Sequence, residues 1–399
     1  AVATTTLTAT GPTPLLLLCS QPATMAEAAS AAVQEPLLRG LPDEITIWEI
    51  LVCLPPKALL RCRAVCPAWR RATSTHDFLL AHHGRQPTLA LLQDYNGDSL
   101  DIIQLDHRTG LSAADHLQSV ARFGSDLFRL AASCDGLLVL TINCVLTFIC
   151  NPATRQYAPL PLLRGFTVLG MYMYSPTCEY RLLLYPNPIL RQANLLPDTQ
   201  DGYYVFTIGS GQLPRHIGCP DAERLVYDTT ISVLFHGSMH WYTDQMIMVF
   251  DITTELFRRM RCPIVSSKAR LFEIGGMFGM SSLKDEAATA TMDIWVMQDY
   301  QSEVWAFKHR VEFPVAPLTL QFGEFHCQWS VVVPSGDGHL LVLLNFGDWL
   351  LQMDMDGKLV ASFHRKSVST TQLRLKQTLV PQGFFPTREG YVVNTWPFT

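Results

Sequence analysis

Two histidines of this 399-residue chain have a spacing that could hold a metal ion. His236 and His240 form an H-x-x-x-H pair, in which both imidazoles would lie on one face of a helix. Gly237 stands where a zinc protease of this pattern carries its glutamate base, and the surrounding residues have the composition of a strand, in which the two rings would lie far apart. We therefore expect a structural role for both histidines and no metal site.

A second candidate for a metal site lies nearer the N-terminus. Cys62 and Cys66, followed by His76 and His82, are residue types suited to a zinc knuckle, and the C-x-x-x-C separation fits a helix. Free cysteines more often act as small buried apolar residues. We expect structural thiols here, and the sequence predicts neither a metal nor another cofactor.

The glycine-rich segments offer no catalytic chemistry. Gly209-Ser210-Gly211 and Gly275-Gly276 lack the Lys-Ser/Thr pair and the following helix of a phosphate-binding loop, so we interpret both as turns between strands. The sequence contains no Gly-x-Ser-x-Gly nucleophile elbow. It therefore predicts no catalytic residue, and we expect a protein that is not an enzyme.

The residues from Leu41 to Trp69 indicate protein binding instead. Apolar residues recur there at helical spacing, between two Leu-Pro pairs and a closing Val-Cys-Pro-Ala-Trp. A segment of about forty residues cannot bury so many large side chains by folding alone, so they form either a small core or an interface, and we expect most to contact a partner. The candidate contact residues are Leu41, Pro42, Ile45, Ile50, Leu51, Leu54, Pro55, Leu59, Val65 and Trp69.

Composition limits the class of protein. Apolar residues make up 48% of the chain and charged residues 16%, which allows a large core and argues against wholesale disorder. The net charge of -5 lacks the basic footprint of a nucleic-acid-binding protein. The most apolar later stretch, Leu137 to Cys150, is too short and too polar to span a membrane. We expect neither nucleic acid nor a membrane as a partner.

The cysteines and the N-terminal residues bear on the compartment. Eleven cysteines without a repeated spacing favour free, mostly buried thiols in a reducing compartment, the cytoplasm or the nucleus. No basic residue precedes Arg39, which argues against a signal peptide. Residues 1–36 have the composition of a flexible tail, and we expect natural translation to start at Met25.

Residues 37–84 are predicted to be helical. Pro42 suits the first turn of a helix whose apolar stripe runs through Ile45, Trp48 and Val52, and Pro55-Pro56 ends that helix. Two further short helices follow, one around Leu59, Leu60 and Arg63 and one over Val65 to Ala72, and a last one over Phe78 to His82 closes the region.

Residues 85–399 are predicted to be all-β. Short apolar segments alternate with turn residues every 8–12 positions, which is typical of a sandwich, a barrel or a propeller, and no long helical pattern supports a parallel α/β fold. The clearest predicted strands are Leu137–Leu140, Val145–Cys150, Tyr203–Ile208, Met246–Asp251, Ile294–Met297, Val304–Lys308, Leu340–Asn345 and Leu350–Met355.

A weak internal repeat favours the propeller over the sandwich. The segments that start at Phe148, Val249 and Leu351 share one plan: an apolar strand, an Asn or Asp, a tight turn with Thr or Gly, and a second strand. The starts lie roughly a hundred residues apart, about two propeller blades. We expect roughly six blades, with a β-sandwich as the alternative.

The helical region resembles an F-box. The residues that carry the resemblance are Leu41-Pro42, Asp43-Glu44, Glu49-Ile50-Leu51, Leu54-Pro55, Leu59-Leu60-Arg61, Val65-Cys66-Pro67-Ala68-Trp69-Arg70 and Ser74 to Phe78. Pro67 departs from the pattern, which often has Arg or Lys there, although proline is tolerated at a helix start. The resemblance implies docking of the Skp-type adaptor of a cullin–RING ubiquitin ligase.

The downstream region resembles the F-box-associated domain of plant F-box proteins. The matching segments are Ser133 to Leu138, Cys150 to Arg155, His236 to Trp241 and Asp293 to Met297. The resemblance implies that a small helical F-box precedes a large all-β domain, and that this domain captures a protein for ubiquitination. The alternative is a β-propeller binding or scaffold protein with no ubiquitin role.

Overall fold

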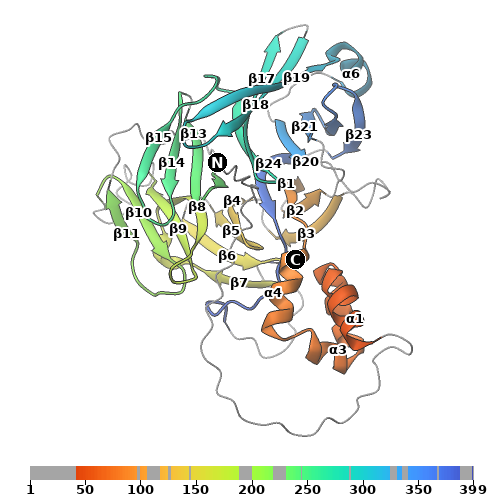
Figure 1. Cartoon of the computed structure of the whole chain (residues 1–399), viewed down its shortest axis with the longest axis vertical. Helices are drawn as coiled ribbons and strands as arrows, with labels where there is room; N and C mark the ends of the chain where they lie inside the picture. Colours follow the sequence, from red (N-terminus) through yellow and green to blue (C-terminus); the bar gives the residue numbers. More distant parts are fainter. Residues whose placement is uncertain are drawn as a thin grey trace, which may run out of the picture.

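The computed structural model describes residues 42–96, 99–105, 117–124, 127–142, 145–187, 200–218, 231–243, 245–286, 289–323, 330–334, 340–365, 368–386 and 398, and the structural statements below concern these residues. A small helical region lies to one side of a large ring of β-sheets (Figure 1). None of the described helices is long and apolar enough to cross a membrane.

The helical region is built from short helices whose ends are set by proline and threonine. Its elements are α1 (Asp43–Ile45), the π-helical turn η1 (Thr46–Ile50), the 3-10 turn η2 (Leu51–Cys53), α2 (Pro56–Val65), α3 (Pro67–Ala72) and α4 (His76–Arg85). Pro56 and Pro67 occupy first positions, where the missing N–H costs nothing. Thr75 caps α4, because its Oγ1 accepts a hydrogen bond from the Phe78 N–H at 3.4 Å.

One helix boundary differs from the prediction. Val65 ends α2 and does not begin α3. Proline disfavours a helical conformation in the residue before it, and Cys66, which precedes Pro67, is extended at φ −129° and ψ 106°. The chain therefore breaks at Cys66, and the side chain of Val65 is left at the exposed end of α2.

The all-β domain is a six-bladed propeller of antiparallel four-stranded sheets, which confirms that part of the fold prediction and rules out the sandwich. The first three sheets, each in hydrogen-bonded order, are β24 (Val368–Leu375), β1 (Leu89–Asn96), β2 (Ser99–Leu105) and β3 (Leu117–Phe123); β4 (Phe128–Cys134), β5 (Leu137–Ile142), β6 (Leu146–Asn151) and β7 (Gln156–Pro159); and β8 (Phe166–Tyr174), β9 (Glu179–Pro186), β10 (Tyr203–Thr207) and β11 (Arg215–Gly218).

The other three sheets follow the same plan. They are β12 (Val233–Phe235), β13 (Ser238–Thr243), β14 (Met246–Asp251) and β15 (Phe257–Met260); β16 (Ala269–Ile274), β17 (Met277–Glu286), β18 (Thr289–Asp299) and β19 (Val304–Phe313); and β20 (Ser330–Pro334), β21 (Leu340–Phe346), β22 (Trp349–Met353) and β23 (Leu359–His364). The eight strands predicted from the sequence all fall on strands of the propeller.

The ring is closed by its last strand. β24 pairs antiparallel with β1, so the C-terminal part of the chain completes the first blade. The Thr371 hydroxyl donates a hydrogen bond of 2.7 Å to the Leu91 carbonyl within this blade. The strands β24, β4, β8, β12, β16 and β20 each form the inner edge of their blade and surround the propeller axis. Figure 1 labels four of them near the centre of the ring: β24, β4, β8 and β20.

The predicted repeat is the turn between the third and fourth strands of a blade. Asn151, Asp251 and Asp354 each accept hydrogen bonds at Oδ1 from backbone N–H groups two to four residues later. Successive turns of these three lie two blades apart, and the sequence analysis did not recognise a repeat in the blades between them. One of those blades has the same turn at Asp299, whose Oδ1 accepts from the N–H groups of Gln301 and Ser302.

Two elements between blades were not predicted. The 3-10 turn η3 (Pro161–Leu163) joins β7 to β8, and the helix α6 (Val315–Phe322) follows β19. Leu318 and Phe322 of α6 are buried, and the Phe322 ring lies 6.4 Å from that of Phe346 in β21. α6 therefore covers apolar surface between the last two blades.

The thiols differ in part from the expectation. The seven described cysteines are all free, as predicted, but only Cys150 is buried. Cys53 and Cys178 are exposed and the other four are half-buried, so the prediction of mostly buried thiols was wrong for this part of the chain.

Candidate protein-docking site

The helical region leaves apolar side chains in solvent although it has a core of its own. Ile45 is 42% exposed, Trp48 41%, Ile50 43% and Val65 78%. Together with two of the exposed prolines, these side chains form what we call the exposed apolar set: Pro42, Ile45, Trp48, Ile50, Pro55 and Val65. The propeller does not shelter this set, although it packs against other residues of the region.

The π-helical turn η1 determines which side chains face outward. In a regular α-helix, Ile45, Trp48 and Val52 would share one face. The wider turn over Thr46–Ile50 shifts the register, so that Leu51 and Val52 are buried whereas Ile45, Trp48 and Ile50 remain partly in solvent. The predicted stripe is therefore divided between the core and the surface.

The ten predicted contact residues occupy three kinds of position. Leu51 and Leu59 are buried in the core of the helical region, which leaves them no surface for a partner, and Leu54 and Trp69 pack partly against the same core. The exposed ones are Pro42, Ile45, Ile50, Pro55 and Val65, and Leu41 lies outside the described residues. Trp48, 41% exposed, and Leu80 of α4, 39% exposed, were absent from the prediction.

A buried histidine holds the corner between η2 and α2. The His82 Nε2 lies 2.8 Å from the Leu54 carbonyl oxygen, and the Gln86 Nε2 donates to the same oxygen at 3.2 Å. Burial lowers the pKa of His82, so the neutral ring is favoured near pH 7. The sequence alone did not indicate this role, although His82 and Gln86 lie one helical turn apart.

The helical region is attached to the propeller by residues that follow β24. Leu379 is buried among Leu51, Val52, Leu59, Phe78 and Leu79. Two polar contacts lie beside it: the Lys376 Nζ donates to the Gly84 carbonyl at 3.0 Å, and the His83 Nδ1 lies 3.1 Å from the Gln377 carbonyl. Lys376 and Gly84 are 292 positions apart in the sequence, so a segment far along the chain completes the helical core.

Of the two histidines of the H-x-x-x-H pair, His240 has hydrogen-bond partners within the protein. His240 is fully buried in β13, with Nε2 2.8 Å from the Tyr300 hydroxyl oxygen and Nδ1 3.2 Å from the Val233 carbonyl oxygen. His236 is in the hairpin turn before β13, at φ 46°. Within the described ranges, no three His, Cys, Asp or Glu side chains are grouped so that they could hold a metal ion.

Comparison with known families gives two matches. The family model described as "F-box associated beta propeller domain" matches residues 99–346, and the model described as "F-box-like" matches residues 38–83. The first match covers more than half of the chain: it includes four blades completely and two of the four strands in each of the other two. The chain belongs to the F-box-associated β-propeller family, and it carries an N-terminal F-box.

Curated relatives are F-box proteins of Arabidopsis thaliana. "F-box protein At5g49610" is 25% identical over 287 residues, which cover 66% of this chain and 77% of that protein. "F-box protein At5g65850" is 27% identical over 311 residues, covering 71% and 75%, and "F-box/kelch-repeat protein At3g04660" is 25% identical over 289 residues, covering 67% and 72%. This F-box protein is therefore of the plant type, with an F-box followed by a propeller.

Proposed function

We propose that this F-box protein is the substrate-recognition subunit of an SCF-type (Skp–cullin–F-box) ubiquitin ligase. The F-box docks the Skp-type adaptor, and through it the cullin and RING subunits, while the propeller captures a protein for ubiquitination. The observation that carries this proposal is the exposed apolar set on a helical region that already has a closed core. A core that is complete without these side chains leaves them available to a partner.

The exposed side chains can supply useful binding energy. Full burial of an apolar side chain contributes about 1.5–3 kcal/mol, so side chains that are already about half-buried contribute roughly half of that each. Trp48 is the strongest candidate for an anchor, because tryptophan is over-represented at the centres of interfaces and the Trp48 ring already rests 5.6 Å from that of Phe78.

The attachment of the F-box to the propeller suits a receptor that works by proximity. Leu379 and the Lys376–Gly84 hydrogen bond fix the F-box against the end of the propeller where β24 stops. A protein bound to the propeller would then be held in a defined position relative to the ligase scaffold. Such a receptor needs no catalytic residue, because it raises the effective concentration of an acceptor lysine.

We expect the substrate at the propeller end remote from the F-box. Ala153, in the turn between β6 and β7, packs against the F-box, so the turns between first and second and between third and fourth strands lie at the near end. The remaining connections lie at the far end because strands alternate in direction. Exposed apolar residues are found on those connections, at Leu127, Leu162, Val265 and Leu320, and loops on a rigid scaffold commonly carry recognition.

The test measures binding of purified Skp-type adaptor to the full chain. The variant Ile50→Asp/Val65→Asp places two carboxylates within the exposed apolar set, and we expect adaptor binding at least about a hundredfold weaker because each charge would be desolvated. The matched control Leu213→Asp/Leu256→Asp changes exposed residues in two propeller turns and is expected to bind normally. Equal binding by both variants would contradict the proposal.

A second measurement separates a receptor from a scaffold. In cells that express Ile50→Asp/Val65→Asp, a protein captured by the propeller is expected to lose ubiquitin conjugates and to accumulate. Proteins that co-purify with the propeller without any change in conjugation or abundance would refute the receptor role, even if the adaptor binds as expected.

A further inference from the structure

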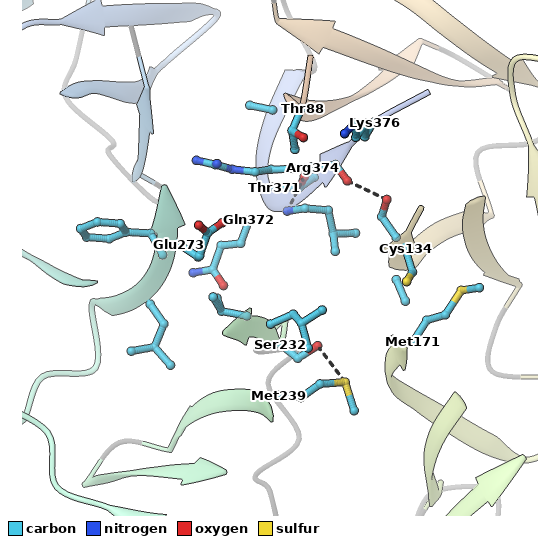
Figure 2. Close-up of a pocket in the computed structure, with 18 of the residues that line it drawn as sticks. Thr88, Cys134, Met171, Ser232, Met239, Glu273, Thr371, Gln372, Arg374 and Lys376 are labelled. Atoms are coloured by element: carbon cyan, nitrogen blue, oxygen red, sulfur yellow. Dashed lines mark hydrogen bonds between the residues drawn. The ribbon is translucent and has the colours of Figure 1, made fainter. Parts of the chain in front are cut away.

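A cavity of about 290 Å³ lies on the propeller axis. Its lining comes from strands next to the axis, including β24, β4, β8, β12 and β16 (Figure 2). None of its lining residues belongs to the exposed apolar set. The cavity is therefore separate from the surface proposed to bind the adaptor.

The strands next to the axis carry more positive than negative charge. Their sequences contain Arg129, Arg270 and Arg374 but a single carboxylate, Glu273. β20, whose sequence is SVVVP, has no ionisable residue. The Arg129 and Arg270 side chains donate to backbone carbonyls at 2.9 and 2.8 Å, so both are engaged by the protein itself.

The other charged residues of the lining also have partners within the protein. The Lys376 ammonium donates to the Gly84 carbonyl, and one Asp135 carboxylate oxygen accepts from the Tyr180 hydroxyl at 3.3 Å. The Glu273 Oε1 accepts from the Gly276 N–H at 2.7 Å. These groups are held at the edge of the cavity by contacts that do not need a ligand.

Arg374 differs from the other charged lining residues. It is half-buried, and among the described residues its guanidinium donates no hydrogen bond and forms no ion pair, although Glu273 attracts it from a distance. Burial lowers the pKa of Arg374, which means that its charged form has lost solvation. A guanidinium has five N–H donors, and because Arg374 is only half-buried these donors remain accessible to an acceptor in the cavity.

The rest of the lining is largely apolar. Met171, Met239, Leu234 and Phe272 contribute to it, and Figure 2 shows Met171 and Met239 around the same space as Glu273, Gln372 and Arg374. Thioether side chains adapt to irregular apolar groups. The cavity thus combines one available guanidinium with surroundings suited to a non-polar body.

We propose that the axial cavity binds a small organic carboxylate, with the carboxylate on the Arg374 guanidinium and an apolar body against the methionines. A monoanion matches the single available positive charge, whereas a doubly charged phosphate would carry one more negative charge than Arg374 balances. Planar bidentate pairing between guanidinium and carboxylate gives the strong hydrogen bonds that the protein does not itself provide here. This site goes beyond the proposed adaptor docking and does not depend on it.

Binding of benzoate to the full chain, measured by ligand-observed NMR, tests this site. We expect saturable binding by the natural chain and binding at least about tenfold weaker for benzamide, the neutral analogue of similar shape. The variant Arg374→Gln is expected to weaken benzoate binding by about ten- to a hundredfold, whereas Arg261→Gln, the same charge change on an exposed loop, leaves it unchanged.

Three outcomes would overturn the proposal: no saturable benzoate binding, equal binding by Arg374→Gln and Arg261→Gln, or preference for inorganic phosphate over benzoate. If Arg374→Gln does not fold, Arg374→Lys serves in its place, since it keeps the charge but loses the bidentate fork and should still weaken binding. Adaptor binding by a folded Arg374 variant should be normal, so a failure of this proposal is distinguishable from a failure of the docking proposal.

Discussion

Substitution of Leu379 by alanine tests whether the propeller completes the F-box core. Leu379 is 4% exposed, so its side chain is almost fully removed from water in the folded chain. Loss of three carbons costs roughly 2.4 kcal/mol in transfer free energy at about 0.8 kcal/mol per methylene, and a residual cavity adds to this. We expect a local destabilisation of about 3 kcal/mol, within the range measured for buried leucines.

Hydrogen exchange on the full chain measures this effect where it should occur. A cost of about 3 kcal/mol corresponds to roughly a hundredfold loss of amide protection. We expect that loss in α2 and α4, whose Leu59, Phe78 and Leu79 surround Leu379, and no change in β13 and β14 on another blade.

A matched control is available within the same chain. Leu320→Ala makes the same chemical change at a side chain that is 91% exposed, and it should alter stability by less than about 0.5 kcal/mol. Unchanged protection of α2 and α4 in Leu379→Ala, or an equal loss throughout the propeller, would refute the view that Leu379 joins the F-box to its scaffold.

Three further predictions concern the propeller. Burial lowers the pKa of His240 to about 4, below its unfolded value near 6.5. The free energy of unfolding should therefore fall by about 3 kcal/mol in total as the pH drops from about 6.5 to 4. Calorimetry of His240→Gln should show a flatter dependence of stability on pH. Gly357→Ala should be severely destabilising in thermal unfolding, because φ is +75° and the added Cβ would lie against the Glu312 carbonyl, whereas Gly211→Ala, with φ +68° and open space, should cost less. Asn151→Ala should cost about 1–3 kcal/mol in urea unfolding, because the buried amide donates to the Thr378 carbonyl at 3.1 Å, and Asp299→Ala in an exposed turn should cost less.

The strands could be predicted from the sequence because their signals are local. Runs of β-branched and aromatic residues, bounded by Gly, Asn and Asp, located eight strands and one recurring turn. The same turn at Asp299 was missed because the four residues after Asp299 include neither the Thr nor the Gly that marked the other three turns. The helix α6 was also missed, since eight residues give too short a pattern for helical periodicity.

The sequence predicted the candidate docking residues as a set but did not show which of them are exposed and which are buried. Sequence spacing identified an excess of apolar residues, and Ile45, Ile50 and Val65 are indeed exposed. It could not separate Ile45 and Ile50 from Leu51, because a regular helix was assumed where the chain forms a π-helical turn. The extra residue in the π-helical turn changes the helical register, so that side chains expected on one face of the helix lie on another.

The sequence by itself determined the kind of protein this is: an F-box motif and β-strand segments with a repeated turn, each encoded within a few neighbouring residues. Only the tertiary structure decided which apolar side chains stay in solvent, that Leu379 enters the F-box core, and that Arg374 faces a cavity on the axis. These outcomes depend on residues that meet only after the ring closes through β24, and no local pattern records contacts between segments almost three hundred positions apart, as between Gly84 and Lys376.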